Sequence, residues 1–218
     1  MEILSPIHWE TVTPELRTLL EFVGQCAFAS RFYLAGGTAL ALRLGHRRSV
    51  DLDFFSAVDE VGRATRLEIL RALASLGAEA LEDVDGNLLL EVRGIHVGFF
   101  GYSYTLLEPP TAVAGVALAG VADIGLMKLD ALISRGARKD FYDLYWIARH
   151  IPLADLLALG REKYPYARDF EWQAVESLVF FDNADRDVQP QLLMETPWEE
   201  VKAFFRAEAC RLSQVWLR

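Results

Sequence analysis

The sequence predicts an α+β fold, with strands and helices together in residues 1–120 and helices alone in residues 121–218. Three observations predict it. Short β-type runs occur only before about residue 120, and stretches of helical period lie between them. After that point apolar residues recur at helical spacing, and prolines separate the stretches. A chain of 218 residues can bury a core as one domain or as two, and we predict domains 1–120 and 121–218.

The first predicted helix spans residues 14–29, with Thr13 as N-cap and Pro14 at the first helical position. RFYLA then predicts a strand that two glycines close, TALALRLG predicts a helix, and HRRS predicts a loop. Residues 50–55 alternate between polar and apolar side chains, which is the period of a strand.

In the rest of this half we predict a helix over residues 62–76. Three apolar segments follow it, and the list of all four is residues 62–76, 88–92, 95–100 and 111–118. Arg93-Gly94 predicts a tight hairpin turn between the second and third of these. In the C-terminal half we predict five helices: residues 121–134, 140–149, 153–164, 170–180 and 198–212.

Composition narrows the functional classes. Hydrophobic residues make up 52% and charged residues 24%, as in soluble globular proteins. A net charge of −9 argues against broad, non-specific binding to nucleic acid, but it allows a local basic patch. We see no signal peptide and no membrane span. The two cysteines, Cys26 and Cys210, form no metal-type spacing, so we expect a reduced cytoplasmic protein.

The stretch LAGGTALALRLGHRRSVDLDFFS carries the chemistry. Gly36 and Gly37 let the backbone approach a phosphate closely, and the helix that begins near Thr38 points free N–H groups at the anion. Asp51 and Asp53 are two apart in a strand, so both side chains project from one face. Paired carboxylates on one face suit Mg²⁺, which prefers carboxylates together with substrate phosphates.

Each motif alone has a simpler explanation, because a glycine pair is usually a turn and Asp-x-Asp is usually surface. Their succession indicates a site. Two carboxylates in an otherwise apolar strand, just after a glycine-to-helix turn, are hard to explain as solvation.

GGTALALRLGHRRSVDLDFF resembles the signature of the AbiEii toxins, a branch of the DNA polymerase β-like nucleotidyltransferase superfamily. KLDALISRGARKDFYDLYWI is similar to that family's second block, and FFDNADRDVQPQLLMETPWEEVKAFF to its tail, so the resemblance spans most of the chain. It implies a nucleotidyltransferase-type mixed sheet flanked by helices and followed by a helical half.

The resemblance also implies roles for residues. The nucleotide-phosphate turn would be Gly36, Gly37 and Thr38. The metal ligands would be Asp51 and Asp53, and the catalytic set would add Lys128 and Asp143 or its neighbour Asp140. Asp140 is equally explained as a helix N-cap, and Lys128 as a solvated helix residue.

One position departs from the superfamily pattern, which usually has a third carboxylate on a later strand. The matching run is IHVGFF, where Gly98 replaces that residue. If Arg93-Gly94 forms the hairpin, Glu91 pairs with His96 and shares a face with Gly98. Glu91 could then partly replace the missing ligand, two carboxylates could suffice, or the chemistry could be weak or lost.

Basic residues flank both blocks: Arg43, Arg47 and Arg48 before the carboxylates, and Arg135, Arg138 and Lys139 before Asp140. Guanidinium groups hold phosphates by paired hydrogen bonds, so Arg47 and Arg48 are candidate nucleotide-binding residues. Ordinary loop arginines explain them as well. The four histidines show no metal spacing and are taken as structural, with His46 in the loop beside the predicted cleft.

We therefore expect Mg²⁺-dependent transfer of a nucleoside monophosphate from a nucleoside triphosphate. The resemblance implies an acceptor such as RNA and a cognate antitoxin. Two rivals remain. One is a catalytically lapsed nucleotide-binding or interaction module, and the other is a nucleotidyltransferase that modifies a small molecule.

Overall fold

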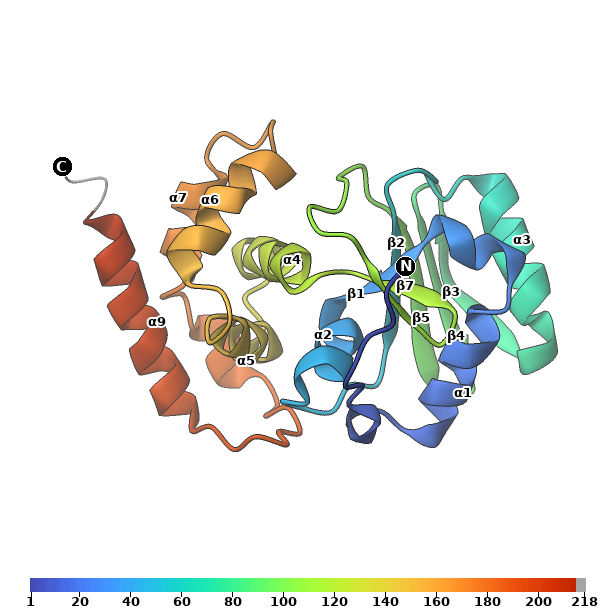
Figure 1. Cartoon of the computed structure of the whole chain (residues 1–218), viewed down its shortest axis with the longest axis horizontal. Coiled ribbons are helices and arrows are strands. Elements are labelled where there is room, and N and C mark those ends of the chain that lie inside the picture. Colours follow the sequence, from blue (N-terminus) through green and yellow to red (C-terminus); the bar gives the residue numbers. More distant parts are fainter. Residues whose placement is uncertain (215–218) are drawn as a thin grey trace. The chain divides into compact units, whose positions relative to one another are not determined.

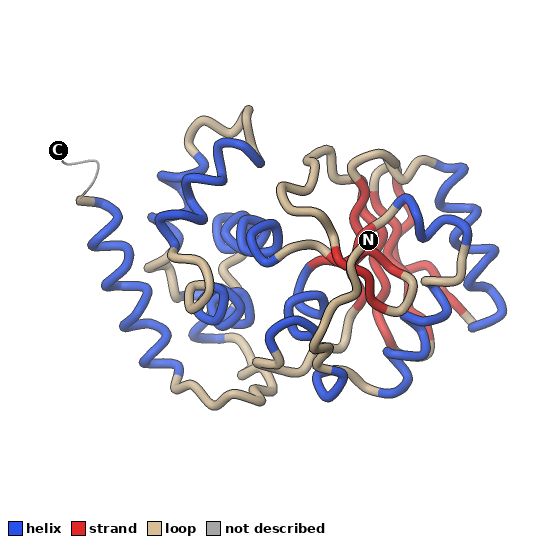
Figure 2. Tube along the Cα trace, in the orientation of Figure 1, coloured by secondary structure: helices blue, strands red, loops and turns tan. Residues whose placement is uncertain are grey.

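The computed structural model describes residues 1–214 and divides the chain into two compact units, Met1–Gly120 and Val121–Arg218 (Figure 1). Strands are confined to the first unit, and the described part of the second unit is helical (Figure 2). The α+β prediction, with helices alone after about residue 120, is confirmed.

The N-terminal unit is built on a seven-stranded sheet. Its strands are β1 (Tyr33–Ala35), β2 (Leu52–Ser56), β3 (Ala78–Val84), β4 (Asn87–Val92), β5 (Ile95–Gly101), β6 (Thr111–Val113) and β7 (Val116–Leu118). They lie in the order β3-β4-β5-β2-β1-β7-β6. Strands β2 and β5 run parallel, as do β1 and β7, whereas the other neighbours are antiparallel. The sheet is therefore mixed, as expected.

Helices flank this sheet on both sides. They are α1 (Pro14–Val23), α2 (Gly36–Leu44) and α3 (Arg63–Leu73). Helices α1 and α3 lie on one side and α2 on the other (Figure 1). An aromatic core fills one face, where Phe99 stacks on Phe54 at 5.0 Å and meets Phe28 edge-on at 5.6 Å. Strand β2 alternates between buried and half-buried residues, so Asp53 and Phe55 project from the opposite, half-buried face.

Local signals set most helix ends. The Thr13 hydroxyl accepts a hydrogen bond from the Leu16 N–H at 3.2 Å, which confirms it as the N-cap of α1. Helix α1 ends at Val23 rather than at residue 29, because Gly24 follows and residues 27–31 form a separate 3₁₀ helix. Gly45 caps α2 in the left-handed conformation with φ +69°.

Two tight hairpins shape the sheet. Arg93 (φ 54°) and Gly94 (φ +80°) connect β4 to β5, as predicted, and Ala114 (φ 49°) and Gly115 (φ +81°) connect β6 to β7. Positive φ at both central residues is the type I′ geometry that matches strand twist. Strand β3 was not predicted, because its run AEALEDV is mostly exposed and acidic.

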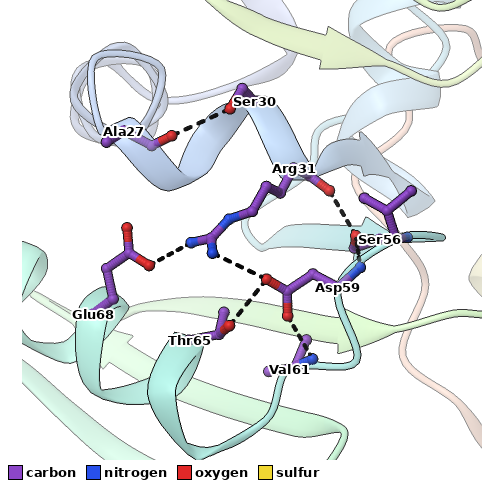
Figure 3. A network of polar contacts seen from close by, with 9 residues as sticks. Ala27, Ser30, Arg31, Ser56, Asp59, Val61, Thr65 and Glu68 are labelled. Carbon is purple, nitrogen blue, oxygen red and sulfur yellow. Dashed lines mark hydrogen bonds and ion pairs between the residues drawn. The ribbon is translucent and has the colours of Figure 1, made fainter.

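The loop after β2 is held by a polar network around Asp59 (Figure 3). Asp59 Oδ1 accepts the Val61 N–H at 2.8 Å, and Asp59 Oδ2 accepts the Thr65 hydroxyl at 2.9 Å. The Arg31 guanidinium lies 3.3 Å from Asp59 Oδ2. Val61 is fully buried with φ 51°, a conformation that β-branched residues rarely adopt, so Asp59 holds a strained residue in place.

The two edges of the sheet differ. At β6, residues 2–4 add a parallel bridge, with the Leu4 N–H donating to the Ala112 carbonyl at 3.0 Å. At the other edge, β3 has a register shift between Ala80 and Glu82, and most of its side chains are exposed.

The C-terminal unit contains α4 (Val121–Ser134), α5 (Arg138–Ile147), α6 (Leu153–Lys163), α7 (Phe170–Ser177), α8 (Asp182–Arg186) and α9 (Trp198–Ser213). Helices α4 and α6 approach closely at Gly125, where an added Cβ would lie 2.9 Å from Leu156. Across residues 1–214, no helix combines the length and apolarity needed to cross a membrane.

Candidate functional site

The turn between β1 and α2 depends on Gly36. Its φ is +66°, a left-handed conformation that costs a residue with a side chain about 1–2 kcal/mol. A Cβ here would also lie 2.8 Å from Asp53 Oδ2. Both facts require glycine. The backbone at the start of α2 therefore lies directly beside the Asp53 carboxylate, where the free N–H groups of the first turn favour anions.

Gly36→Ala is expected to lower the free energy of unfolding by about 1–2 kcal/mol and to displace the Asp53 carboxylate. Chemical denaturation and nucleotidyl transfer by the folded protein measure the two effects. Gly62→Ala is the matched control, because a Cβ at Gly62 meets nothing within 4 Å and its φ is −69°. Equal stability and activity in the two variants would contradict this account of the turn.

Gly37 makes room for an arginine. A Cβ at this position would lie 2.4 Å from Arg47 Nη2, so the guanidinium lies against the backbone of the turn. Arg47 is buried, and its Nη1 donates to the Arg48 carbonyl at 3.0 Å, whereas Arg48 itself is exposed. Arg47 thus adds positive charge behind the glycine turn.

Arg43 does not belong to such a phosphate patch. Its Nε donates to the Ala119 carbonyl at 2.8 Å and its Nη2 to the Leu118 carbonyl at 3.1 Å and the Thr111 hydroxyl at 2.7 Å. Burial lowers the pKa of Arg43, while Glu108 opposes that shift. Of the two interpretations of Arg43, the contacts favour the structural one, because this side chain fixes the end of β7.

Thr38 joins the turn to the carboxylate segment. Its buried hydroxyl donates to the Asp51 carbonyl and lies 2.8 Å from Ser49 Oγ. Thr38 therefore helps to position Asp51. Sequence reasoning missed Ser49, and only the polarity of HRRS hinted at it.

Asp53 lies in β2, and Asp51 directly precedes that strand, with buried Leu52 between the two aspartates. Asp53 pairs in register with Ala35 of β1 and Gly98 of β5. The Asp51 side chain is 36% exposed, so it is accessible to a ligand. The pair therefore lies beside the glycine turn, as the order of the motifs predicts.

The positions of two histidines differ from the prediction. The sequence predicts a structural role for His96, but its Nδ1 lies 3.6 Å from Asp51 Oδ1 and its side chain is 53% exposed. His46, expected beside a cleft, is fully buried. Strand register explains the first difference, because His96 comes two residues before Gly98 on the strand beside β2.

Gly98 lies opposite Asp53, at the position expected for a third carboxylate. Glu91 pairs with His96, as predicted. Within residues 1–214, however, no three His, Cys, Asp or Glu side chains gather to hold a metal ion, so Glu91 does not complete the set. Two carboxylates still fit Mg²⁺, which is commonly bound through one or two carboxylates plus substrate phosphates.

The second group of predicted residues lies in the C-terminal unit. Lys128 Nζ of α4 lies 2.8 Å from Asp140 Oδ1 and 2.7 Å from Asp143 Oδ2, both on α5. Arg135 Nε donates to Asp140 Oδ2 at 2.8 Å. Lys128 is buried and both aspartates are fully buried, so Lys128 is not a solvated helix residue. The N-cap of α5 is Ala137, which excludes Asp140 from that role.

The charges of this cluster make stability depend on pH. Burial would raise the pKa of Asp140, but Lys128 and Arg135 together hold it below its usual value. The unfolded chain therefore binds the proton more readily, and Asp140 stabilises the fold above about pH 4 but loses this effect as pH falls through the lowered pKa. In denaturant titrations, the stability gap between wild type and Asp140→Asn should be widest at neutral pH and narrow in acid. A stability difference between the two proteins that stays constant with pH would contradict this role of Asp140.

Another buried ion pair was not predicted. Lys163 Nζ of α6 lies 2.7 Å from Asp123 Oδ1 of α4, and neither side chain is exposed. Both residues fall at core positions of their helices, where a charge needs a partner. The sequence signal that could have indicated this ion pair is a charged residue at a helix position where the spacing predicts an apolar one.

Comparison with known proteins gives a consistent result. The family model described as nucleotidyl transferase AbiEii toxin, type IV TA system, matches residues 17–107 and 101–208. An uncharacterised protein of Aquifex aeolicus is 38% identical over 198 residues, which cover 88% of this chain and 93% of that protein.

Two solved structures share the fold. MenT4, a nucleotidyltransferase toxin from Mycobacterium tuberculosis, aligns with a TM-score of 0.57 and 18% identity over 90% of this chain and 84% of its own. The antibiotic-resistance factor ANT(2'')-Ia aligns with a TM-score of 0.52 and 17% identity over 69% of this chain and 94% of its own. Since the family model covers most of the sequence, the chain belongs to the AbiEii toxin family of nucleotidyltransferases.

Proposed function

We propose that this nucleotidyltransferase uses Mg²⁺ at Asp51 and Asp53 to transfer a nucleoside monophosphate from a nucleoside triphosphate to an RNA acceptor. We further propose that it acts in the cytoplasm as a toxin under the control of a cognate antitoxin. One observation carries the proposal. The Asp53 carboxylate lies against Gly36 at the start of α2, and Asp51 directly precedes the strand that carries Asp53.

This arrangement assigns a task to each group. The N–H groups of the first turn of α2 receive the triphosphate, and Arg47 adds positive charge behind Gly37. Asp51 and Asp53 would hold the metal, which would offset negative charge on the phosphates during transfer. The acceptor hydroxyl loses its proton to water as its oxygen bonds to the α-phosphorus, the bond from that phosphorus to the oxygen bridging the α- and β-phosphates breaks, and pyrophosphate leaves.

Lys128 and Asp143 remain proposed contributors to transfer. In the structure the two carboxylates of Asp140 and Asp143 hold the Lys128 ammonium in one place. Asp140 is proposed to position that ammonium, since Arg135 binds its second oxygen. A fixed ammonium is a compact positive charge with three hydrogen-bond donors.

The test is to incubate the pure protein with each labelled nucleoside triphosphate and Mg²⁺, in parallel with total RNA and with a panel of small hydroxylated molecules. The expected result is labelled RNA together with pyrophosphate. Label on a small molecule alone would reject the RNA acceptor. Omission of Mg²⁺ should stop the reaction.

A second candidate function is nucleotide binding without turnover. Gly98 favours it, because a glycine cannot supply the third carboxylate through its side chain. This candidate predicts that calorimetry detects triphosphate binding in Mg²⁺ while no acceptor becomes labelled. Any labelled product that depends on Asp53 rejects it.

A further inference from the structure

The half-buried face of the sheet continues from the carboxylates into aromatic rings. Asp53 and Gly98 pair across β2 and β5, and two residues along each strand Phe55 pairs with Phe100. Their ring centroids are 5.1 Å apart. Because strand side chains alternate between faces, these rings lie on the same face as Asp53.

The rings extend beyond the strands. Tyr102 meets Phe55 edge-on at 5.6 Å, and Tyr104 meets Tyr102 edge-on at 5.1 Å. We call Phe55, Phe100, Tyr102 and Tyr104 the aromatic ladder. All four members are half-buried, whereas the rings of Phe54 and Phe99 on the other face belong to the closed core. The ladder therefore keeps ring surface accessible to a ligand.

Gly98 determines how close the ladder comes to the carboxylates. A Cβ at Gly98 would lie 2.4 Å from two ring carbons of Phe100 and 3.5 Å from Asp53 Oδ1. The Phe100 ring thus lies over Gly98, in space that any larger residue would fill. Gly98 lacks the carboxylate expected at this position. Because it has no side chain, the Phe100 ring can lie next to the Asp53 carboxylate.

We propose that the aromatic ladder binds a nucleobase of the substrate and that Gly98 makes room for Phe100 to take part. This inference rests on the proposed function. A nucleotide whose phosphates lie at the Gly36 turn and the carboxylates has its base within one nucleotide length of them. Aromatic rings beside a phosphate site offer every base a stacking surface. The base belongs either to the nucleoside triphosphate or to the RNA acceptor.

The experiment compares ligands with and without a base, all in Mg²⁺. Tripolyphosphate and a nucleoside triphosphate form one pair, and an RNA oligonucleotide and its abasic counterpart form the other. Tyr102→Leu is expected to weaken binding of one base-containing ligand by about tenfold and to leave tripolyphosphate binding unchanged. Tyr166→Leu, at a tyrosine that is 90% exposed, is the matched control.

Gly98→Ala is the second variant. Its Cβ has to displace the Phe100 ring but meets Asp53 Oδ1 only at an ordinary contact distance of 3.5 Å. It should reproduce the base-dependent loss and keep tripolyphosphate binding. Thermal melting of both variants confirms that they fold.

Loss confined to the nucleoside triphosphate assigns the donor base to the ladder, and loss confined to the oligonucleotide assigns the acceptor base. Unchanged affinity for both, or an equal loss for tripolyphosphate, overturns the inference. The proposed function fails separately, if wild type binds neither tripolyphosphate nor nucleoside triphosphate in Mg²⁺.

Discussion

Asp53→Ala is expected to abolish nucleotidyl transfer while the N-terminal unit stays folded. The carboxylate lies on the half-buried face of β2 beside the glycine turn, rather than in the aromatic core. A metal ion held as proposed would supply several kcal/mol of stabilisation to the transition state, so loss of one of its ligands should slow transfer by at least about a thousandfold. Asp51→Ala should also abolish transfer and leave the unit folded. Product formation and thermal melting of each variant measure the effects.

Asp59→Ala is the informative control within the same unit. Asp59 binds the Val61 N–H and the Thr65 hydroxyl and holds the loop after β2 (Figure 3). Its loss should reduce stability but leave transfer by the folded fraction near the wild-type rate. Wild-type activity in both Asp51→Ala and Asp53→Ala would exclude the carboxylate pair from the reaction.

Lys128→Met is expected to destabilise the C-terminal unit by about 3–5 kcal/mol, because removal of one partner leaves buried charge uncompensated. Asp140 and Asp143 are both fully buried, and Arg135 forms an ion pair with Asp140. The interpretation of Lys128 as a solvated helix residue predicts little loss of stability on its substitution. Its burial reverses that expectation. Denaturant titration measures the loss.

Two further variants separate the contributions. Lys139→Met changes an exposed lysine of α5 and should alter stability by no more than about 0.5 kcal/mol. Lys128→Met combined with Asp143→Asn removes one charge of each sign and should recover part of the loss. A normal melting temperature for Lys128→Met would contradict the ion cluster. Transfer by the folded double variant then shows whether the Lys128–Asp143 pair also takes part in the reaction.

Local chemistry explains which parts of the fold the sequence predicts. Thr13 caps α1, Gly45 caps α2, and Arg93-Gly94 forms the hairpin, because each signal acts within a few residues. Strand β3 escapes prediction, because most of its residues are exposed and no alternation marks a buried face. Pairing with β4 creates this strand, and that pairing is a tertiary contact.

The same distinction applies to the candidate site. The glycine turn and the carboxylate pair follow from spacing along 18 residues, Gly36 to Asp53, counted from the sequence. By contrast, the Phe100 ring over Gly98 depends on a side-chain orientation that no spacing encodes. The Lys128 cluster lies between these cases. The spacing of Asp140 and Asp143 predicts a shared helix face, but only the packing of α4 against α5 brings the lysine to them.

The β3 edge also bears on how the protein behaves at high concentration. An open edge strand can pair with the same edge of another copy and begin aggregation. Here Glu79, Glu82 and Asp83 line the edge, and the register shift after Ala80 interrupts its regular ladder. Two such edges would bring like charges together. These charges flank exposed Leu81 and Val84, whose side chains would otherwise offer another copy an apolar edge to pair with.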